Sequence, residues 1–242
     1  MKLDVLAFGA HPDDTELCCA GTLASLIRKG YKVGVVDLTR GEMGTRGTAE
    51  GRLEEAGNAA RLLGLSVRDN LGLPDCGLDN TEEHRLEIIK AVRKYRPEIC
   101  FINAPDDRHP DHGNASRLVV DALFYGGLKN IVTKGQETWR PHHILHYMQN
   151  YPFEPTIVYD ISETFEIKEK AILAFESQFN VPDSASGPKT YISGKSFFEA
   201  LRGKARHYGH LIGVDYGEPF LYHGGPIPAK DMNFLMENKP FR

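Results

Sequence analysis

Two short stretches of the sequence are dense in histidine and aspartate. The first covers residues 11–16 (HPDDTE) and directly follows the apolar run Leu3–Phe8. Histidine and carboxylate side chains are common zinc ligands, and a turn stiffened by a proline can hold His11 and an aspartate close together. The alternative is that Asp13 or Asp14 only caps the helix that follows. The concentration of ligand-type residues favours a cation site.

The second stretch covers residues 103–112 (NAPDDRHPDH), between an apolar run and a helical pattern. His109 and His112 bracket a Pro-Asp pair there, and a polar loop with helix-capping residues is the alternative explanation. The two stretches together supply enough groups for a catalytic zinc site, which needs three protein ligands and an open position. His142, His143 and His146 resemble a further cluster, but they fall in a strand-like run and are interpreted as core or edge residues.

The first stretch also argues against a nucleotide site. A dinucleotide-binding fold has a Gly-x-Gly-x-x-Gly turn after its first strand, where backbone N–H groups approach a pyrophosphate. This chain has one glycine at that position, Gly9, followed by three carboxylates. Negative charge there would repel phosphate, so a nucleotide-binding oxidoreductase fits the order of elements but not this loop.

Strand-like and helix-like runs alternate along the chain, which is typical of a parallel sheet covered by helices. Strands are expected at Leu3–Phe8, Lys32–Leu38, Arg68–Leu71, Ile99–Asn103, His143–Met148 and Thr156–Asp160. Helices are expected at Thr15–Lys29, Ala49–Leu63, Thr81–Tyr95, His112–Phe124, Glu163–Phe175 and Lys195–His207. We predict an α/β, Rossmann-like fold in one domain spanning residues 1–242, with a mostly parallel sheet and helices on both faces. Ligands bind outside the carboxyl ends of such strands, so the two stretches should converge.

The composition excludes several classes of protein. The 242 residues carry a formal net charge of -4, without the basic face typical of nucleic-acid binding. The four cysteines include no Cys-x-x-Cys pair, which excludes a zinc ribbon and suits a reducing cytoplasm. The start of the chain lacks the apolar region of a signal peptide, and no apolar run approaches the ~20 residues of a membrane helix. We expect a cytoplasmic protein that binds neither nucleic acid nor membrane.

The two stretches together resemble the signature of the PIG-L-type zinc deacetylases, also called the LmbE-like family. Residues 10–16 match its Ala-His-Pro-Asp-Asp-x-Glu loop, residues 109–112 match its His-x-Asp-His motif, and the likeness extends to residues 213–220 (GVDYGEPF). The resemblance implies a Rossmann-like fold and a Zn²⁺-dependent enzyme that removes an acetyl group from a small N-acetylated sugar. It also suggests a homo-oligomer, such as a hexamer.

The resemblance assigns roles to individual residues. The residues that match the family's zinc ligands are His11, Asp14 and His112. The residues that match its catalytic groups are Asp13 as general base, His109 as stabiliser of the oxyanion and Asp111 as the group that orients His109. The residues that match its sugar-binding positions are Arg52 and Asp75.

The substrate is the least determined part of this interpretation. Length and the loop at residues 39–44 (TRGEMG) look most similar to the bacillithiol-pathway branch, whose members deacetylate N-acetylglucosaminyl malate. Arg108, beside His109, is the arginine expected to contact an anionic substrate, whereas Arg40 and Arg46 equally suit a solvated loop. The alternatives are an inositol conjugate, a chitobiose-like sugar, a thiol-conjugate amide cleaved by a zinc amidase, or no catalysis. Asp13 and His109 speak against the last, since neither is needed merely to hold zinc.

The expected chemistry divides the work among these groups. A zinc ion lowers the pKa of its bound water to about 7 and polarises the amide carbonyl, and Asp13 would then take a proton from the water. We expect His109 to be protonated, because a carboxylate partner such as Asp111 favours the imidazolium. Either Asp13 or His109 would protonate the leaving amine. Glu16 either orients a ligand or places favourable charge at a helix N-terminus.

Overall fold

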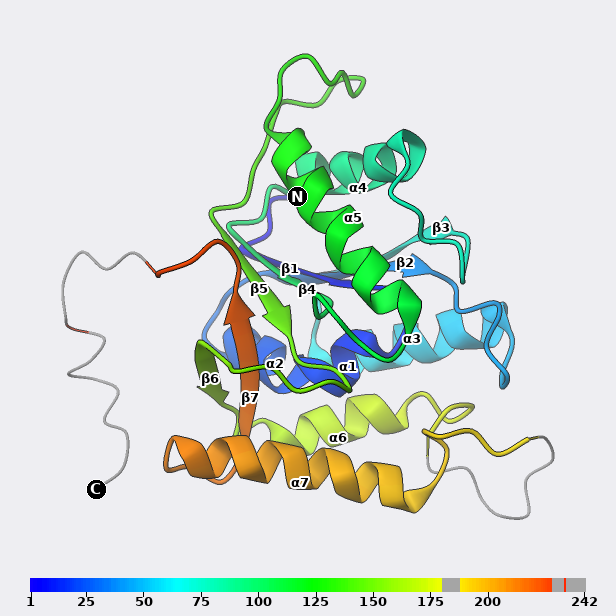
Figure 1. Cartoon of the computed structure of the whole chain (residues 1–242), viewed down its shortest axis with the longest axis vertical. Helices are drawn as coiled ribbons and strands as arrows, with labels where there is room; N and C mark the ends of the chain where they lie inside the picture. The colour runs from blue at the N-terminus through cyan, green and yellow to red at the C-terminus, as the bar shows by residue number, and fades with distance from the viewer. Residues whose placement is uncertain (180–187, 228–232, 234–242) are drawn as a thin grey trace.

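The computed structural model describes residues 1–179, 188–227 and 233 of the chain. Within these residues one sheet runs in the order β3-β2-β1-β4-β5-β7-β6 (Figure 1). The strands are β1 Val5–Gly9, β2 Val33–Thr39, β3 Val67–Leu73, β4 Ile99–Ile102, β5 His143–Tyr147, β6 Ile157–Asp160 and β7 Gly217–Tyr222. The helices are α1 Asp14–Cys18, α2 Ala20–Arg28, α3 Ala49–Leu63, α4 Glu82–Tyr95, α5 Pro110–Gly126, α6 Phe165–Leu173 and α7 Lys195–Leu211.

The order of the parallel strands brings the two motif loops together. β1 lies between β2 and β4 and pairs in parallel with both, with Val5 opposite Val33 on one side and Ile99 on the other. The chain builds outward from β1 through β2 to β3, and then returns to place β4 on the other side of β1. The carboxyl ends of β1 and β4 are therefore neighbours at the point where the strand order reverses. This is where ligands bind in open α/β sheets.

Both faces of the sheet are covered, which explains why β1 is apolar throughout rather than alternating. Leu6 and Phe8 of β1 face the core beneath α4 and α5, whereas Val5 and Ala7 face the opposite core, beneath α2. Helices α6 and α7 lie outside α1, α2 and α3, on the side of the sheet away from α4 and α5 (Figure 1). The predicted α/β class, with a mostly parallel sheet and helices on both faces, is confirmed.

Capping residues place the ends of two predicted helices. Thr48 precedes α3 and accepts a hydrogen bond from the N–H of Gly51, and Gly64 ends the helix with a left-handed φ of 77°. Thr81 caps α4 in the same way by accepting from the N–H of His84. These side chains satisfy N–H groups that have no partner within the helix. Helix α3 has the predicted bounds, and α4 begins one residue later than predicted.

The structure differs from the prediction between residues 15 and 29. The single expected helix is two, α1 and α2, separated at Cys19, whose φ of -138° is not helical. The N–H groups of Gly21 and Thr22, in the first turn of α2, donate to the carboxylate of Glu218. Glu218 therefore serves as the cap for a helix nearly 200 positions earlier, which local sequence does not reveal.

The prediction also lacked β7. This strand pairs antiparallel with β5 and with β6, and so separates two strands that are consecutive in sequence. Its sequence, GEPFLY, contains a glycine and a proline, both of which weaken a strand pattern. The insertion makes this end of the sheet mixed rather than parallel.

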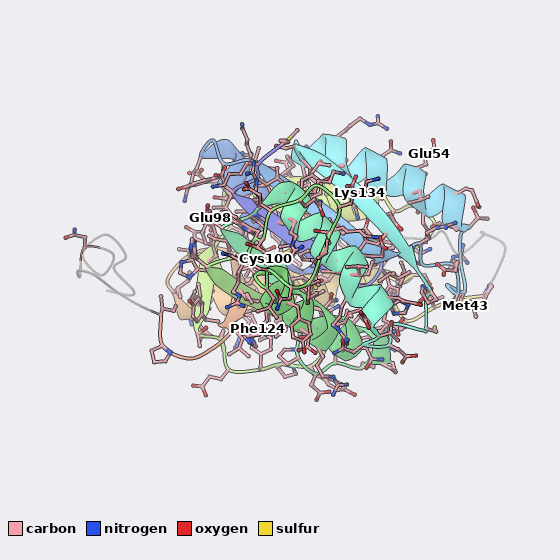
Figure 2. All side chains as sticks on the ribbon, turned by 90° about the horizontal axis from the view of Figure 1, so that it is seen from above. Met43, Glu54, Glu98, Cys100, Phe124 and Lys134 are labelled. Carbon is pink, nitrogen blue, oxygen red and sulfur yellow. The ribbon has the colours of Figure 1, made fainter. Side chains whose placement is uncertain are left out.

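The cysteines are unpaired, and Cys18, Cys19 and Cys100 are buried. Figure 2 shows Cys100 within the molecule and Met43, in the loop after β2, at its edge. Among the described residues, no helix combines the length and apolar character that crossing a membrane requires.

Candidate active site

The loops after β1 and β4 bring three candidate ligands to one place. His11 follows β1, Asp14 is the first residue of α1, and His112 lies in the first turn of α5. The Nδ1 atom of His11 is 3.8 Å from Oδ2 of Asp14, and Nε2 of His112 is 3.2 Å from Oδ1 of Asp14. All three side chains are buried, and one ligand atom from each lies within 4.8 Å of the others. The arrangement leaves a shared space that a metal ion fits.

Each of the two histidines has its other ring nitrogen held by a carboxylate. The Nε2 atom of His11 is 3.1 Å from Oδ1 of Asp75 and 3.4 Å from Oδ2 of Asp111. The Nδ1 atom of His112 is 2.6 Å from Oδ2 of Asp107. Metal-binding histidines in proteins are held in this way, because the carboxylate fixes the tautomer and the ring orientation. The environment of both rings thus fits a metal ligand.

The electrostatics of the space favour a positive charge. Burial alone would lower the pKa of His11, but hydrogen bonds with Asp111 and Asp75 raise it to about 10. Burial opposes the charged form of His112 too, yet the Asp14 charge and the Asp107 hydrogen bond raise its pKa to about 9. Burial would raise the pKa of Asp14, but the two histidines hold it well below its usual range. A bound cation would experience the same concentration of negative charge.

Asp13 is directed away from its neighbour Asp14 by an unusual backbone conformation. Its φ is 119°, in the region that favours glycine, and its side chain makes no capping hydrogen bond to α1. Instead its Oδ2 atom accepts from Nη2 of Arg52 at 3.0 Å. Burial raises the pKa of the Asp13 carboxyl to about 7, against the opposing effect of Arg52. The capping alternative does not describe this residue, which instead lines a pocket described below.

The positions predicted to bind sugar have other contacts as well. Arg52 is buried and donates to the carbonyl of Pro12 as well as to Asp13, so its contacts hold Asp13 in place. Asp75 contacts His11 through one oxygen and accepts from the N–H of Met43 through the other. Both residues line the pocket described below, but these protein contacts already occupy both Asp75 oxygens. Arg52 contacts Asp13 and Asp75 contacts His11. A sugar-binding role for Arg52 and Asp75 did not predict these contacts.

The structure revises the relation between His109 and Asp111. His109 caps α5, and its side chain accepts a hydrogen bond from the backbone N–H of Asp111, with Nδ1 3.3 Å from that nitrogen. The Asp111 carboxylate faces His11 and the N–H of Cys76 instead. Burial, with His11 and His112 nearby, lowers the pKa of His109. Both the hydrogen bond accepted at Nδ1 and this lowered pKa disfavour the protonated ring that the sequence led us to expect.

Glu16 has a contact that neither sequence interpretation included. Its Oε1 atom accepts from Nη1 of Arg68 at 2.5 Å, and the same guanidinium donates from Nε to Oδ2 of Asp37 at 2.8 Å. These side chains belong to α1, β3 and β2. The buried network joins the turn that carries the candidate ligands to two strands of the sheet.

A pocket of about 480 Å³ opens over these groups. It is lined by the histidines and aspartates and by apolar residues of α1 and α7, including Leu17, Phe197 and Leu201. Arg108 lies exposed at the pocket, with its guanidinium carbon 4.9 Å from the ring centroid of Tyr191. A volume in this range holds a small organic ligand larger than one sugar ring.

Three residues near the candidate ligands were missed by the sequence interpretation. Asp107 holds His112, and the side chain of Gln149 bridges Asn103, 3.1 Å away, and His112, 2.9 Å away. Lys204, on α7, lines the pocket and donates to the carbonyl of Gln149. Asp107 lies within the second motif stretch and Gln149 follows the carboxyl end of β5. Both positions could therefore have been recognised from the sequence as close to the site. The sequence offers none for Lys204.

The sequence of this chain is similar to those of known deacetylases. Residues 6–123 match the family model described as PIG-L, GlcNAc-PI de-N-acetylase. The chain is 33% identical over 235 residues to diacetylchitobiose deacetylase of Thermococcus kodakarensis, covering 91% of this chain and 83% of that one. It is 28% identical over 192 residues to a probable N-acetyl-alpha-D-glucosaminyl L-malate deacetylase 2 of Bacillus anthracis, covering 72% and 81%.

Among solved structures, the conserved protein TT1542 from Thermus thermophilus superposes with a TM-score of 0.85 at 41% identity. The match covers 94% of this chain and 98% of that protein, so the two share the whole fold. The extent of these matches, together with the two motif loops at the switch point of the sheet, establishes that this chain belongs to the PIG-L family.

Proposed function

We propose that this protein is a zinc-dependent N-deacetylase that hydrolyses the acetamide of a small conjugate containing N-acetylglucosamine. The observation that carries the proposal is the convergence of His11, Asp14 and His112, with Asp13 beside them but held apart by Arg52. Two imidazoles and one carboxylate, with room for further ligands, are the donor set of catalytic zinc sites. The family match supports the reaction, and similarity to deacetylases of N-acetylated sugars supports the substrate class.

A zinc ion held by these three residues would acidify a water molecule and polarise the acetamide carbonyl. Asp13 is the group that accepts the proton from the attacking water. Its carboxylate keeps one hydrogen bond to Arg52, which orients it and keeps part of its charge compensated. General bases placed in this way contribute about 10²–10⁴-fold to a rate.

His109 lines the same pocket as Asp13 and donates through Nε2 to the oxyanion that forms on the acetamide. Its ring centroid is 4.8 Å from that of His11, and this proximity to a proposed ligand supports a role beside the reacting carbonyl. The hydrogen bond from the Asp111 N–H to Nδ1 selects the tautomer that carries its proton on Nε2. A neutral donor serves here because its orientation is set before the reaction begins. Asp13, having taken a proton, returns it to the departing amine.

Two substrates are favoured by different observations. Similarity to diacetylchitobiose deacetylase, over 91% of the chain, favours a disaccharide of N-acetylglucosamine. The exposed guanidinium of Arg108 at the pocket favours an anionic conjugate, N-acetyl-alpha-D-glucosaminyl L-malate of bacillithiol biosynthesis. The chain is more similar to the chitobiose deacetylase than to the malate-conjugate deacetylase, both in identity and in the share of the chain that is matched. We therefore place the chitobiose-type substrate first.

Amine release from a panel of substrates tests the proposal. The panel contains diacetylchitobiose, the malate conjugate, an inositol conjugate and a thiol-conjugate amide, each with and without a metal chelator. Release that stops with the chelator and returns with Zn²⁺ supports the mechanism, and the substrate with the highest kcat/KM identifies the class. Release unaffected by complete metal removal, or release only from the thiol conjugate, would contradict the proposal.

The variant Arg108→Ala separates the two substrates. If Arg108 binds a carboxylate, its loss should raise KM for the malate conjugate at least tenfold, because a charge-assisted hydrogen bond is worth about 1.5–3 kcal/mol. The KM for diacetylchitobiose should change little. Arg40→Ala, in the loop after β2, is the control for loss of positive charge. An equal effect of Arg108→Ala on both substrates removes the argument for an anionic ligand.

A further inference from the structure

Lys204 is a partly buried cation that the proposed reaction does not use. It lies on α7, whose residues Phe197, Ala200, Leu201 and Lys204 follow one another at helical spacing along the pocket wall. Burial lowers the pKa of the Lys204 ammonium. Among the residues that the structure describes, no carboxylate forms an ion pair with it. Its hydrogen bonds go to two backbone carbonyls, those of Met148 at 2.9 Å and Gln149 at 2.8 Å.

These carbonyls belong to residues 148–151, the segment that follows β5. The segment contacts the proposed ligand His112 through the side chain of Gln149. The N–H groups of Asn150 and Tyr151 donate to Oδ1 of Asp107 at 2.8 and 3.0 Å. The other oxygen of Asp107 holds Nδ1 of His112 at 2.6 Å. The segment therefore presents a fixed pair of donors to the carboxylate that orients the ring.

Gln149 makes a second connection from the same segment. Its Oε1 atom accepts from Nδ2 of Asn103 at 3.1 Å, and its amide nitrogen lies 3.3 Å from Oδ1 of Asp14. Residues 148–151 thus contact the surroundings of two proposed metal ligands. Helix α7 comes from the far end of the chain, and Lys204 connects it to this segment through the two hydrogen bonds to backbone carbonyls.

We propose that Lys204 is a positioning residue for the metal site: it anchors the segment 148–151 to α7 and so keeps Asp107 and Gln149 in place against His112 and Asp14. This inference rests on the proposed metal centre. It assigns to α7 a part in metal binding although the helix contributes none of the proposed ligands. Loss of a group that orients a ligand reduces metal affinity by about 10–100-fold.

The affinity for Zn²⁺ alone tests the inference without reference to substrate. Full-length protein is freed of metal with a chelator and titrated with Zn²⁺ against a chromophoric competitor. Lys204→Met, which keeps the length of the side chain but removes its donors, should raise the Kd for Zn²⁺ at least tenfold. Lys204→Arg, which can donate to the same carbonyls, should restore most of the affinity. Lys195→Met, an exposed position on the same helix, is the control and should bind as wild type.

A double-mutant cycle separates this role from a general loss of stability. If Lys204 acts through Asp107, then Lys204→Met should weaken Zn²⁺ binding much less in an Asp107→Asn background than in wild type. Lys204→Gln, which keeps one donor, replaces Lys204→Met in the cycle if the methionine variant does not fold. Unchanged affinity in Lys204→Met, or effects that add fully in the cycle, would overturn the inference. Absence of tight Zn²⁺ binding by the wild type would instead overturn the proposed metal centre.

Discussion

At the scale of single residues, two adjacent aspartates have separate roles because the backbone directs them apart. Asp14 begins α1 and faces His11 and His112, whereas Asp13 sits at a φ of 119° and faces Arg52. A left-handed conformation at a residue other than glycine is strained by about 1–3 kcal/mol and is found mostly at functional sites. This backbone conformation turns the proposed base away from the ligand set but leaves it at the same pocket.

The variant Asp13→Asn tests this separation. Asparagine keeps an oxygen that can accept from Arg52 but cannot take a proton at neutral pH, so kcat should fall about 10²–10⁴-fold. Because Asp13 is not a proposed ligand, the Zn²⁺ content measured by elemental analysis should stay equimolar. Retained turnover would remove Asp13 as the base, and loss of zinc would show that it belongs to the ligand set.

At the scale of elements, α7 approaches the strand β7 so closely that only glycine fits at one position. A Cβ atom added at Gly209 would lie 2.7 Å from backbone atoms of Tyr216, the residue just before β7. The same helix contains Gly203, where an added Cβ meets nothing within 4 Å. Helix α7 therefore offers two glycines with opposite expected responses to the same substitution.

Gly209→Ala should destabilise the protein by about 1–3 kcal/mol, because the backbone of Tyr216 must move to admit the methyl group. Gly203→Ala should stabilise it by up to about 1 kcal/mol, since alanine favours a helix interior over glycine. Chemical denaturation of both variants gives the two free energies of unfolding. If the two substitutions have the same sign, the close contact between α7 and the start of β7 is wrong.

At the scale of the whole molecule, His146 connects four separate parts of the chain. It lies on β5, donates from Nδ1 to the carbonyl of Asn103 at 2.8 Å, and also lies 3.2 Å from Oγ of Ser116 on α5. Its Nε2 atom is 3.1 Å from Nδ1 of His223, beyond β7. Burial lowers the pKa of His146 to about 4, and His223 adds to this effect. The interpretation of His146 as a core residue rather than a ligand agrees with these contacts.

This burial predicts a loss of stability in mild acid. The unfolded chain binds a proton at His146 with a pKa near 6.5, and the folded chain only near 4. Between these values the unfolded state binds more protons, so the free energy of unfolding falls as pH decreases below 6.5. His146 alone should account for about 2 kcal/mol of the loss between pH 7 and pH 5.

The variant His146→Asn isolates this contribution. Asparagine can still donate to the carbonyl of Asn103 but does not titrate. Between pH 7 and pH 5 the free energy of unfolding of this variant should therefore fall by about 2 kcal/mol less than that of wild type. His142→Asn is the control, because His142 is an exposed histidine that directly precedes β5. An identical pH dependence of His146→Asn and wild type would show that His146 does not carry this effect.

Several features of the protein were determined by local sequence alone. The alternation of apolar and amphipathic runs predicts the α/β class, because strands buried on both faces and helices buried on one have different patterns. Thr48 and Thr81 each cap the helix that begins at the next residue, by accepting a hydrogen bond from the N–H three residues later. The two motif stretches after the first and fourth strands were also located in this way, whereas the choice of His11, Asp14 and His112 within them came from the resemblance to the PIG-L family. Their meeting follows from the rule that parallel strands end at the same edge.

Other features were decided only by the tertiary structure. Glu218 completes α2, and β7 separates β5 from β6, because a partner distant in the chain satisfies groups that local sequence leaves open. The Asp111 carboxylate faces His11 rather than His109, although His109 is nearer in sequence. Lys204 reaches the segment beyond β5 from a helix more than 50 positions later. Each of these contacts depends on how elements pack in space, and a side chain's direction across a packed interface leaves no local pattern in the sequence.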